Sequence, residues 1–589
     1  MTPPPRDRPT LAILPYERRV AGLHAWDPRT REVALSLAEL VKTRRPDLAV
    51  EHIGSTAVPG LPGKGIVDLS VEADPAAIPG IVTDLYALGF GPQPGPDPWP
   101  PNRPMLVGAV IDDGTEFRIH LHIQPSGGTH ARDLAFRDAL RGDPELLRQY
   151  TDLKTRITGG SEVDALRYTH SKTAWILGVY QRLGFAVPAI LPPATIGILG
   201  GGQLGRMLGL AARAMGYRVA VLDPDPACPA AAVADRVEVG GYDDIDAAHR
   251  LAAGCAVVTC ELEHLSLEMV SALDDGSVPV RPGPYALKLT QDRLAERRYL
   301  EANGAAVAPW REISSASELR AGIADLGVPL RLKASHGGYD GRSQIRIGGD
   351  GDLAAALGPA LGPALAMVAA ETAAGRHLLL ERELDFEGEV SVILARGVDG
   401  STRAFPMGHN RHDAGILVES AAPAGLPAGT EVAAGALAAD LATGMGLVGL
   451  LTVECFLMSD GSLVVNELAP RVHNSGHWTI EGARTSQFEQ HIRAICGLPL
   501  GETTLSEGGA ATVNLLGTGT DRAARVVGTD LALEGGRAHV HLYDKRRVFE
   551  RRKMGHVTAV GPSAEAALAA ARDAAMRITW ANATGEEGH

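Results

Sequence analysis

The chain has 589 residues, enough for roughly three or four domains. Its hydrophobic content of 45% and charged content of 21% are those of a folded globular protein. The net charge of −14, with an isoelectric point of about 5.8, argues against non-specific binding to nucleic acid. The first residues lack the apolar stretch of a secretory signal, and no apolar run is long enough for a membrane span, so we expect neither. Its five scattered cysteines lack metal-ligand spacing, so we expect reduced thiols and a cytoplasmic protein.

Residues 1–187 are predicted to form a separate α/β domain. The glycine-rich segment EHIGSTAVPG, at 51–60, leads into an apolar strand that carries Asp68. The segment FRIHLHI alternates strictly between apolar and polar residues, so His120 and His122 lie on one face of a strand. Amphipathic helices are predicted at 132–147 and 164–183.

Four segments of this region resemble the GrpB-like family: EHIGSTAVPG, the HLH strand, LAFRDAL, and Tyr168 with Lys172. That family is similar to the nucleotidyltransferase fold. The resemblance implies that Gly54 and Ser55 cradle a triphosphate and that carboxylates hold a metal ion. Nucleotidyltransferases usually carry two acids spaced D-x-D, whereas this chain has DLS at 68–70, so the second acid is missing. The resemblance therefore implies a fold more than an activity.

The two histidines offer another route to a metal site in this domain. Alternate residues of a strand project from the same face, so His120 and His122 could complete a metal site with Asp68. The other interpretation is that they are ordinary strand residues in a domain without transferase chemistry. On the residues alone we favour this second interpretation.

A proline-rich boundary, FAVPAILPPA at 185–194, separates this domain from the rest of the chain. A predicted strand at 195–199 is followed by GGGQLG at 200–205, which opens a helix, and a second strand ends at Asp223. G-x-G-x-x-G in this setting is a dinucleotide fingerprint, so one hypothesis is an NAD-dependent oxidoreductase. A tight turn without a ligand is another.

A hairpin with two acids is predicted further along the chain. Two apolar runs, 452–458 and 463–468, flank the sequence SDGS, and Asp-Gly between such runs predicts a hairpin. If the loop is the two residues Asp-Gly, Glu454 lies directly opposite Glu467, with Cβ atoms about 4.5–5.5 Å apart. Two facing carboxylates on a rigid hairpin suit Mg²⁺. A three-residue loop would break this pairing.

The segment after the hairpin carries a family resemblance. NELAPRVHNSGHWT, from 466, and SQFEQHIRAICGLPLG, from 486, resemble the N5-carboxyaminoimidazole ribonucleotide synthetase family of ATP-grasp ligases. The resemblance runs from about Thr195 to about Trp580 and includes the segment DPDPACPAAAVADRVEVGGYDD after the glycine-rich turn. It implies an α/β and α+β multidomain protein whose glycine-rich turn faces a substrate instead of NAD. The implied parts are a Rossmann-like pre-ATP-grasp domain at 194–300, an ATP-grasp core at 301–500 and a small β-rich domain at 501–582.

The resemblance also implies an ATP site. Lys333 lies on a predicted strand before a glycine-rich loop, which matches the family loop except for Ser343 in place of glycine. Glu381 and the backbone near Leu384 are expected at the adenine edge, Glu389 at the ribose hydroxyls and His412 near the phosphates. The expected ATP-binding residues are Arg293, Lys333, Gly338, Tyr339, Asp340, Gly341, Arg342, Ser343, Gln344, Glu381, Leu384, Glu389, His412, Asn466 and Glu467. Glu454 and Glu467 are the expected Mg²⁺ ligands.

The reaction that the resemblance implies is the carboxylation of 5-aminoimidazole ribonucleotide in purine biosynthesis. MgATP phosphorylates bicarbonate, and the exocyclic amine takes the carboxyl group from the resulting carboxyphosphate. The expected catalytic residues are Lys333, Arg471, His473, Asn474 and Lys545. The expected ribonucleotide-binding residues are Gly202, Gln203, Leu204, Lys545 and Arg552.

We expect small-molecule substrates, no nucleic-acid or membrane partner, and a homodimer. Two alternatives stay open. One is another ATP-grasp ligase with a different acceptor, such as a formate-using ribonucleotide transformylase. The other is a GrpB-like nucleotide-binding or interaction module fused to a degenerate ligase.

Overall fold

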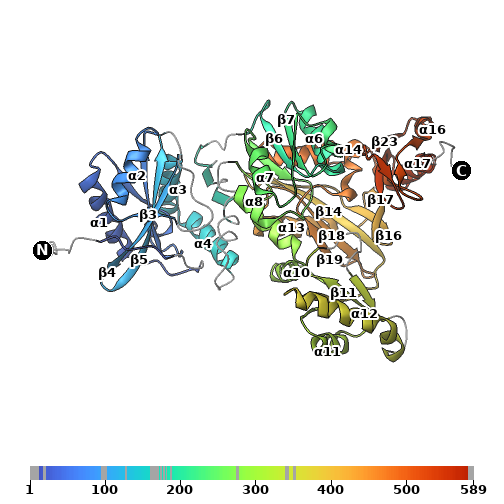
Figure 1. The fold of residues 1–589 in the computed structure, drawn as a ribbon, viewed down its shortest axis with the longest axis horizontal. Helices are drawn as coiled ribbons and strands as arrows, with labels where there is room; N and C mark the ends of the chain where they lie inside the picture. Colours follow the sequence, from blue (N-terminus) through green and yellow to red (C-terminus); the bar gives the residue numbers. More distant parts are fainter. Residues whose placement is uncertain are drawn as a thin grey trace. The chain divides into compact units, whose positions relative to one another are not determined.

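A computed structural model gives the fold of the chain, which divides into two compact units (Figure 1). One unit comprises Met1–Pro188 and Ser271–Ser277, and the other comprises Ala189–Val270 and Val278–His589. The division after Pro188 falls inside the proline-rich boundary predicted from the sequence. The structure describes residues 12–17, 22–93, 102–126, 129–158, 172, 175–176, 179–180, 182–185, 189–273, 278–337, 344–348 and 353–581.

The N-terminal unit is built on a five-stranded sheet of order β1-β2-β5-β4-β3, in which β2 and β5 are parallel. Its strands are β1 Val50–Ile53, β2 Ile66–Ala73, β3 Gly91–Pro92, β4 Met105–Asp112 and β5 Thr115–Pro125. Its helices are α1 Arg29–Arg44, α2 Ile78–Tyr86, α3 His130–Gly142 and α4 Pro144–Thr158. The alternation predicted for β5 is confirmed: Phe117, Ile119, Leu121 and Ile123 are buried in the core, and the histidines lie on the other face.

The helix predicted at 132–147 is instead two helices. Asp143 ends α3, and its Oδ1 accepts hydrogen bonds from the backbone N–H groups of Glu145 and Leu146 at the start of α4. Pro144 has no N–H to continue α3, so the chain restarts there. Most of the helix predicted at 164–183 lies outside the described residues.

The second unit begins with a parallel sheet of order β8-β7-β6-β9. Its strands are β6 Thr195–Leu199, β7 Arg218–Asp223, β8 Arg236–Val239 and β9 Val257–Cys260. Its helices are α6 Gln203–Ala214 and α7 Ile245–Ala252, and α8 Leu267–Leu273 belongs to it up to Val270. Strand β6 is almost wholly buried, as a parallel strand covered on both faces should be.

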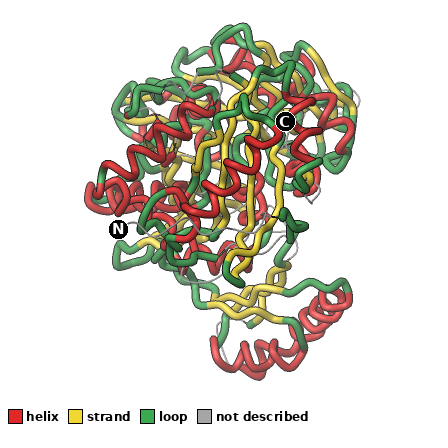
Figure 2. Tube along the Cα trace, turned by 90° about the vertical axis from the view of Figure 1, so that its left-hand side faces the viewer, coloured by secondary structure: helices red, strands yellow, loops and turns green. Residues whose placement is uncertain are grey.

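A small antiparallel sheet of order β10-β13-β11-β12 follows. Its strands are β10 Trp310–Ile313, β11 Leu330–Ala334, β12 Gln344–Ile347 and β13 Leu378–Arg382. Two helices, α11 Ala316–Leu326 and α12 Leu353–Ala373, lie on one face of it (Figure 2). Leu319 and Val368 from these helices pack on Leu332 and Leu380 of the sheet. The opposite face is therefore left for polar residues such as Lys333.

A nine-stranded sheet of order β19-β18-β14-β16-β17-β20-β25-β23, with β15 paired to β14, forms the centre of the second unit. Its strands are β14 Gly388–Arg396, β15 Thr402–Ala404, β16 Gly408–Asp413, β17 Ile416–Ala422, β18 Gly449–Leu457, β19 Leu463–Ala469, β20 Gly509–Leu516, β23 Ala538–Leu542 and β25 Lys553–Gly561. The strands predicted for the C-terminal part are thus present, and they continue this sheet: β20 pairs with β17.

Helices surround this sheet. They are α9 Pro284–Gln291, α10 Arg293–Ala302, α13 Ala428–Gly444, α14 Thr479–Gly482, α15 Gln487–Ile495, α16 Thr529–Leu533 and α17 Ala564–Met576. Short strand pairs join β21 Arg522–Ala523 to β24 Arg547–Val548, and β22 Val526–Val527 to β26 Thr579–Trp580. No helix in the described part of the chain is long and apolar enough to cross a membrane.

Candidate active site

The predicted carboxylate pair is present, but a different turn produces it. Gly461, with φ +80°, donates its N–H to Met458 O at 2.9 Å, and Met458 donates its N–H to Ser462 O at 2.9 Å. This is a three-residue loop in which the glycine takes the left-handed position, and not the two-residue loop on which the predicted pairing depended. On β19 the extra residue Asn466 forms a β-bulge opposite Glu454 and Cys455, so Glu454 still lies opposite Glu467, and the expectation that a three-residue loop would break this pairing is wrong.

Each acid of this pair has a basic neighbour. His473 Nε2 lies 2.8 Å from Glu454 Oε1, and Arg293 Nη1 lies 3.3 Å from Glu467 Oε2. Burial favours the neutral form of Glu454, but the charge and hydrogen bond of His473 outweigh it and lower the pKa of this carboxyl to about 2. Glu454 is therefore ionised at neutral pH. The Glu467 side chain is 42% exposed and so is open to a ligand.

A second acid–histidine pair lies on the next two strands of the sheet. His412 Nδ1 on β16 is paired with Glu389 on β14. Burial opposes the charged imidazole, but Glu389, with Glu454 and Glu467 further away, raises the pKa of His412. The strands β19, β18, β14 and β16 are consecutive neighbours, so one end of the sheet gathers all three acids and the histidine. This clustering agrees with a site for a cation and for the anions that the cation carries.

Lys333 on β11 is held by a buried acid from the neighbouring strand. Its Nζ is paired with Glu381 Oε1, and Arg297 Nη2 lies 2.9 Å from Glu381 Oε2. Although burial alone would raise it, the charges of Lys333 and Arg297 lower the pKa of Glu381 to about 2. Both carboxylate oxygens of Glu381 are engaged, so a contact to adenine through them requires one pair to open. The backbone at Leu384, beyond the end of β13, has no such conflict.

Helix α10 supplies residues that the sequence analysis missed. Arg297 is buried and donates to the backbone O of Asn466 at 2.6 Å, which ties the small sheet to β19. Glu296 accepts the N–H of Leu468 at 2.7 Å, and burial raises the pKa of this acid to about 7. One signal was available: Arg297 follows Arg293 by one helical turn and shares its face.

The polar segment after β19 contains one further acid pair, Arg471 with Glu263, and a short 3-10 helix, η3 Asn474–Gly476. Arg471 makes a two-pronged contact with Glu263, which follows β9, and its charge lowers the pKa of Glu263 to about 2 against the effect of burial. His473 Nδ1 lies 2.9 Å from Ser475 Oγ, which orients the ring so that Nε2 faces Glu454. Asn474 is half-buried beside it.

The glycine-rich turn before α6 is occupied by side chains of the protein. Glu261 accepts the N–H of Gly202 at 2.5 Å and that of Gly205 at 2.6 Å, and Asp223 accepts the N–H of Gly201 at 2.8 Å. A dinucleotide pyrophosphate would need these same N–H groups at the helix N-terminus. The buried carboxylate of Glu261 therefore removes the main anchor of the NAD hypothesis. Gln203 and Leu204 open the helix from the edge of this turn.

The two cations predicted in the C-terminal part lie on either side of β24. Lys545 donates to the backbone O of Lys553 at 2.7 Å and lies over the ring of Tyr543. Arg552 donates to the backbone O of Arg547 at 2.6 Å. Arg551, which precedes Arg552, contacts Asp413 at 2.8 Å, and Asp413 directly follows His412. That contact links the segment after β24 to the end of β16.

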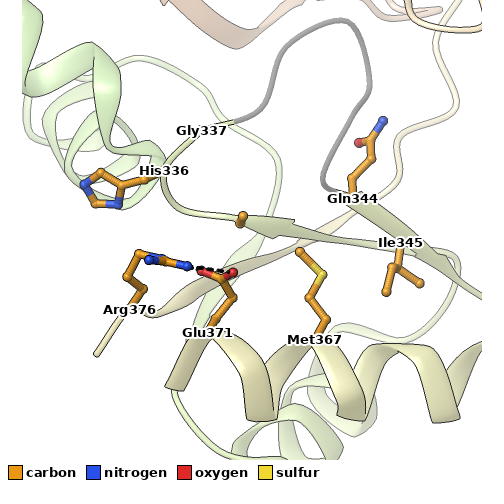
Figure 3. Close-up of a pocket in the computed structure, with 8 residues that line it drawn as sticks. His336, Gly337, Gln344, Ile345, Met367, Glu371 and Arg376 are labelled. Carbon is orange, nitrogen blue, oxygen red and sulfur yellow. Dashed lines mark hydrogen bonds and ion pairs between the residues drawn. The ribbon is translucent and has the colours of Figure 1, made fainter. Parts of the chain in front are cut away.

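A hollow of about 630 Å³ lies under the small sheet (Figure 3). It is lined by Ala334, His336, Gly337, Gln344, Ile345, Met367, Glu371 and Arg376. Ile345 of β12 and Met367 of α12 extend toward it, while Gln344 points to the other face. Ala334 borders the hollow, so its strand neighbour Lys333 faces the opposite side, toward Glu381. The hollow is therefore separate from the acid cluster. Gly338, Tyr339, Asp340, Gly341, Arg342 and Ser343 lie outside the described residues.

Family comparisons agree with these parts. Residues 193–291 match the ribonucleotide synthetase preATP-grasp domain, 298–488 the ATP-grasp domain, 510–570 the phosphoribosylaminoimidazole carboxylase C-terminal domain and 21–182 the GrpB protein family. The chain is 40% identical over 374 residues to the N5-carboxyaminoimidazole ribonucleotide synthase of Brucella melitensis, covering 64% of this chain and 98% of that protein.

Solved structures give the same result. The ADP complex of an N5-carboxyaminoimidazole ribonucleotide synthetase is 39% identical, with a TM-score of 0.59, over 66% of this chain and 98% of the other. The Aspergillus clavatus N5-carboxyaminoimidazole synthase in complex with ADP and 5-aminoimidazole ribonucleotide is 29% identical, with a TM-score of 0.57, over 65% and 99%. After an N-terminal GrpB domain, this chain therefore belongs to the N5-carboxyaminoimidazole ribonucleotide synthetase family of ATP-grasp ligases.

Proposed function

We propose that the second unit catalyses the ATP-dependent carboxylation of 5-aminoimidazole ribonucleotide to N5-carboxyaminoimidazole ribonucleotide, a step of purine biosynthesis. The observation that carries this proposal is the facing pair Glu454 and Glu467, set on neighbouring strands with Glu389 and His412. It is supported by family membership and by relatives whose structures hold ADP, ATP or 5-aminoimidazole ribonucleotide.

The acid pair fits a hard cation. Glu454 and Glu467 offer carboxylate oxygens on a rigid hairpin, and Mg²⁺ is usually held by one or two carboxylates together with substrate phosphates. When bound, the ion neutralises phosphate charge and orients the triphosphate. Arg293, beside Glu467, adds a positive charge at the same place. His473 keeps Glu454 ionised, so that this carboxylate is ready to bind a metal ion.

The small sheet orients the nucleotide. Lys333 supplies a point charge for phosphate oxygens, and Glu381 fixes the direction of its flexible stem. Adenine is read by the backbone near Leu384 beyond Glu381, and Glu389 binds the ribose hydroxyls. Arg297 forms an ion pair with the other carboxylate oxygen of Glu381, so the loss of Arg297 would also disturb Lys333. The family resemblance assigns Gln344 and the glycine-rich residues before it, 338–343, to phosphate binding.

The chemistry is two displacements. A bicarbonate oxygen attacks the γ-phosphorus of ATP, the bond to the β-phosphate oxygen breaks, and ADP leaves. The amine nitrogen of 5-aminoimidazole ribonucleotide then attacks the carboxyl carbon of carboxyphosphate, phosphate leaves, and the amine loses a proton. Arg471, His473 and Asn474 surround the bicarbonate and the amine. They stabilise the charge that develops there, in a site that must exclude water from the labile intermediate.

The ribonucleotide binds between the glycine-rich turn and the C-terminal strands. Gly202, Gln203 and Leu204 contact its sugar side, and Lys545 and Arg552 bind its 5′-phosphate as fixed cations. Glu261 holds the turn in shape through the N–H groups of Gly202 and Gly205. This is a positioning role, because the carboxylate itself is buried.

Omission of single substrates tests the proposal. ADP release by the full chain should need Mg²⁺, and it should reach full rate only when bicarbonate and 5-aminoimidazole ribonucleotide are both present. The alternative acceptor hypothesis predicts instead that formate with another ribonucleotide drives ADP release. A chain that releases no ADP with any of these acceptors would support the degenerate-ligase alternative and overturn the proposal.

Two further parts of the proposal concern the protein in the cell. The homodimer implied by the family resemblance is tested by analytical ultracentrifugation of the full chain, where a single monomeric species contradicts it. A cytoplasmic location agrees with five cysteines that are all free and buried. Fractionation of the source cells tests that location.

A further inference from the structure

A second cluster of metal-binding side chains lies in the N-terminal unit. Asp68 is on β2, and His120 and His122 are on the parallel neighbour β5, where Asp68 is in register with His120. Asp68 Oδ1 lies 3.3 Å from His120 Nδ1 and 3.6 Å from His122 Nε2. One ligand atom from each residue lies within 4.8 Å of the other two. Three ligand atoms this close can meet at one ion.

Neighbouring groups outside the cluster hold its side chains in place. Tyr16 Oη lies 3.0 Å from His120 Nε2, so the other ring nitrogen, Nδ1, is turned toward Asp68. Metal-bound histidines usually have such a partner on the second nitrogen. On the other side, Gly54 has φ +71°, and a Cβ there would lie 2.4 Å from Asp68 Oδ2. The Gly54 backbone therefore packs directly against the carboxylate, at a place that only glycine fits.

Lysines gather beside this cluster. Lys154 is fully buried, and its Nζ donates to Ser55 Oγ at 2.6 Å and to Pro62 O at 2.8 Å. Burial lowers the pKa of Lys154 to about 7 and lowers that of Lys172 as well, and the charges of Lys64 and Asp68 act on both amines. An anion bound among these amines would favour their charged form.

We propose that the N-terminal unit holds a divalent transition-metal ion on Asp68, His120 and His122, and that this ion together with the neighbouring lysines binds a phosphate group. Two imidazoles and one carboxylate suit Zn²⁺, Co²⁺ or Fe²⁺ better than Mg²⁺. Three protein ligands leave coordination positions open, as in sites that bind a further ligand. The ligand class is a phosphate ester or polyphosphate, because the lysines add charge without a second acid. The site is independent of the ligase reaction.

The metal half of this proposal is tested with Co²⁺ on the full chain. Cobalt bound by few ligands, including imidazole nitrogens, absorbs visible light strongly, whereas octahedral oxygen sites absorb weakly. Wild type should show this band at about one equivalent of Co²⁺, and Asp68→Asn and His122→Gln should each lose it. His249→Gln, an exposed histidine of α7, is the matched control and should keep the band. Metal-free wild type and variants should melt at the same temperature.

Two outcomes would overturn the metal site. One is a wild type that shows no band, and the other is an Asp68→Asn protein that binds Co²⁺ with the wild-type spectrum. If Asp68→Asn does not fold, as judged by its metal-free melting curve, His122→Gln alone decides. Ligase turnover should be unchanged in both variants, which separates this result from any failure of the proposed function.

The phosphate half is tested with inorganic pyrophosphate, read through the same cobalt band. Pyrophosphate should shift the band of wild type, and Lys64→Gln should require at least about tenfold more pyrophosphate for the same shift. Lys42→Gln, an exposed lysine of α1 in a surface ion pair with Glu39, is the control and should behave as wild type. A band that does not respond to pyrophosphate, or an equal response in Lys64→Gln and wild type, would overturn the assignment of a phosphate ligand.

Discussion

The acid cluster of the nine-stranded sheet and the Asp68 cluster of the N-terminal unit both combine carboxylates with imidazoles. In the sheet each histidine has its own acid: His473 pairs with Glu454, and His412 with Glu389. In the N-terminal unit two histidines converge on the single carboxylate of Asp68. The first arrangement keeps carboxylate oxygens charged for a hard cation, whereas the second offers nitrogen ligands to a softer one.

The comparison predicts opposite results for one acid from each cluster. Glu467→Gln should lower ligase kcat by about a thousandfold or more, roughly 4 kcal/mol, because an amide packs like the acid but cannot match its charge on Mg²⁺. Asp68→Asn should leave kcat unchanged. Steady-state ADP release measures both, and Glu502→Gln, an exposed acid in a surface ion pair, is the control. A Glu467→Gln enzyme that keeps more than about a tenth of kcat would remove the acid pair from the mechanism.

The variant Glu381→Gln tests the role of the buried ion pairs next to the ligase site. The change leaves Arg297 buried with a weaker partner, and breaking a buried pair of this kind typically costs about 3 kcal/mol or more. We expect a lower melting temperature for the second unit and a raised KM for ATP. Glu383→Gln, two residues further along and in a more exposed pair with Arg331 and Arg346, should cost much less.

The same pair predicts a pH dependence. The pKa of Glu381 is about 2 in the folded state, below its usual 4.5, so the stability that it contributes is present above about pH 4.5 and is lost as pH falls toward 2. The difference in unfolding free energy between wild type and Glu381→Gln should therefore be largest near pH 7 and should shrink below pH 4. Denaturant unfolding at several pH values measures this difference. A difference that stays constant from pH 7 to pH 3 would contradict the ion-pair account.

Nucleotide binding distinguishes an ATP site at the acid cluster from an NAD site at the glycine-rich turn. MgATP should stabilise the second unit by about 2.7 kcal/mol at a hundredfold excess over Kd, which raises its melting temperature. NAD and NADP should have no effect, because Glu261 already occupies the N–H groups of Gly202 and Gly205. Glu261→Gln should not create NAD binding, since the amide remains in the turn. A calorimetric isotherm for NAD but none for MgATP would overturn the ligase assignment.

The smallest expected effect concerns where the second unit begins. Every ligase motif of the sequence follows Thr195, so a chain starting at 194 should keep ligase activity. In the structure Ile190 donates its N–H to Cys496 O at 2.8 Å, and its own carbonyl accepts the hydroxyl of Tyr217 at 2.6 Å. The free energy of unfolding of residues 189–589 should therefore exceed that of residues 194–589 by about 1–2 kcal/mol, because the shorter chain loses this hydrogen bonding and packing. The longer chain should accordingly melt at a higher temperature. Equal melting temperatures would show that these contacts contribute nothing.

The sequence predicted the elements better than it predicted the contacts between them. The strand alternation around His120 and the order of strands and helices around the glycine-rich turn follow local patterns. Glu454 does face Glu467, but through a three-residue loop together with an extra residue in β19. The local hairpin pattern identified the two strands, and it could not predict this combination of loop and bulge.

Buried ion pairs were the main features that the sequence could not provide. Arg297 with Glu381, and Arg471 with Glu263, join residues separated by more than 80 positions. No periodicity connects such distant residues, and only the packed fold shows that they meet. Glu261 is a similar case: it directly follows β9, and only the fold shows that its carboxylate fills the glycine-rich turn.

Transfer of labelled carbon from bicarbonate tests the central claim most directly. Full-length protein is incubated with carbon-labelled bicarbonate, MgATP and 5-aminoimidazole ribonucleotide, and the labelled product and ADP are quantified together. The account predicts one labelled N5-carboxy product per ADP, in wild type and in Asp68→Asn, and no product in Glu467→Gln. ADP formation without transfer of the label to the ribonucleotide, or equal transfer by Glu467→Gln, would contradict the account.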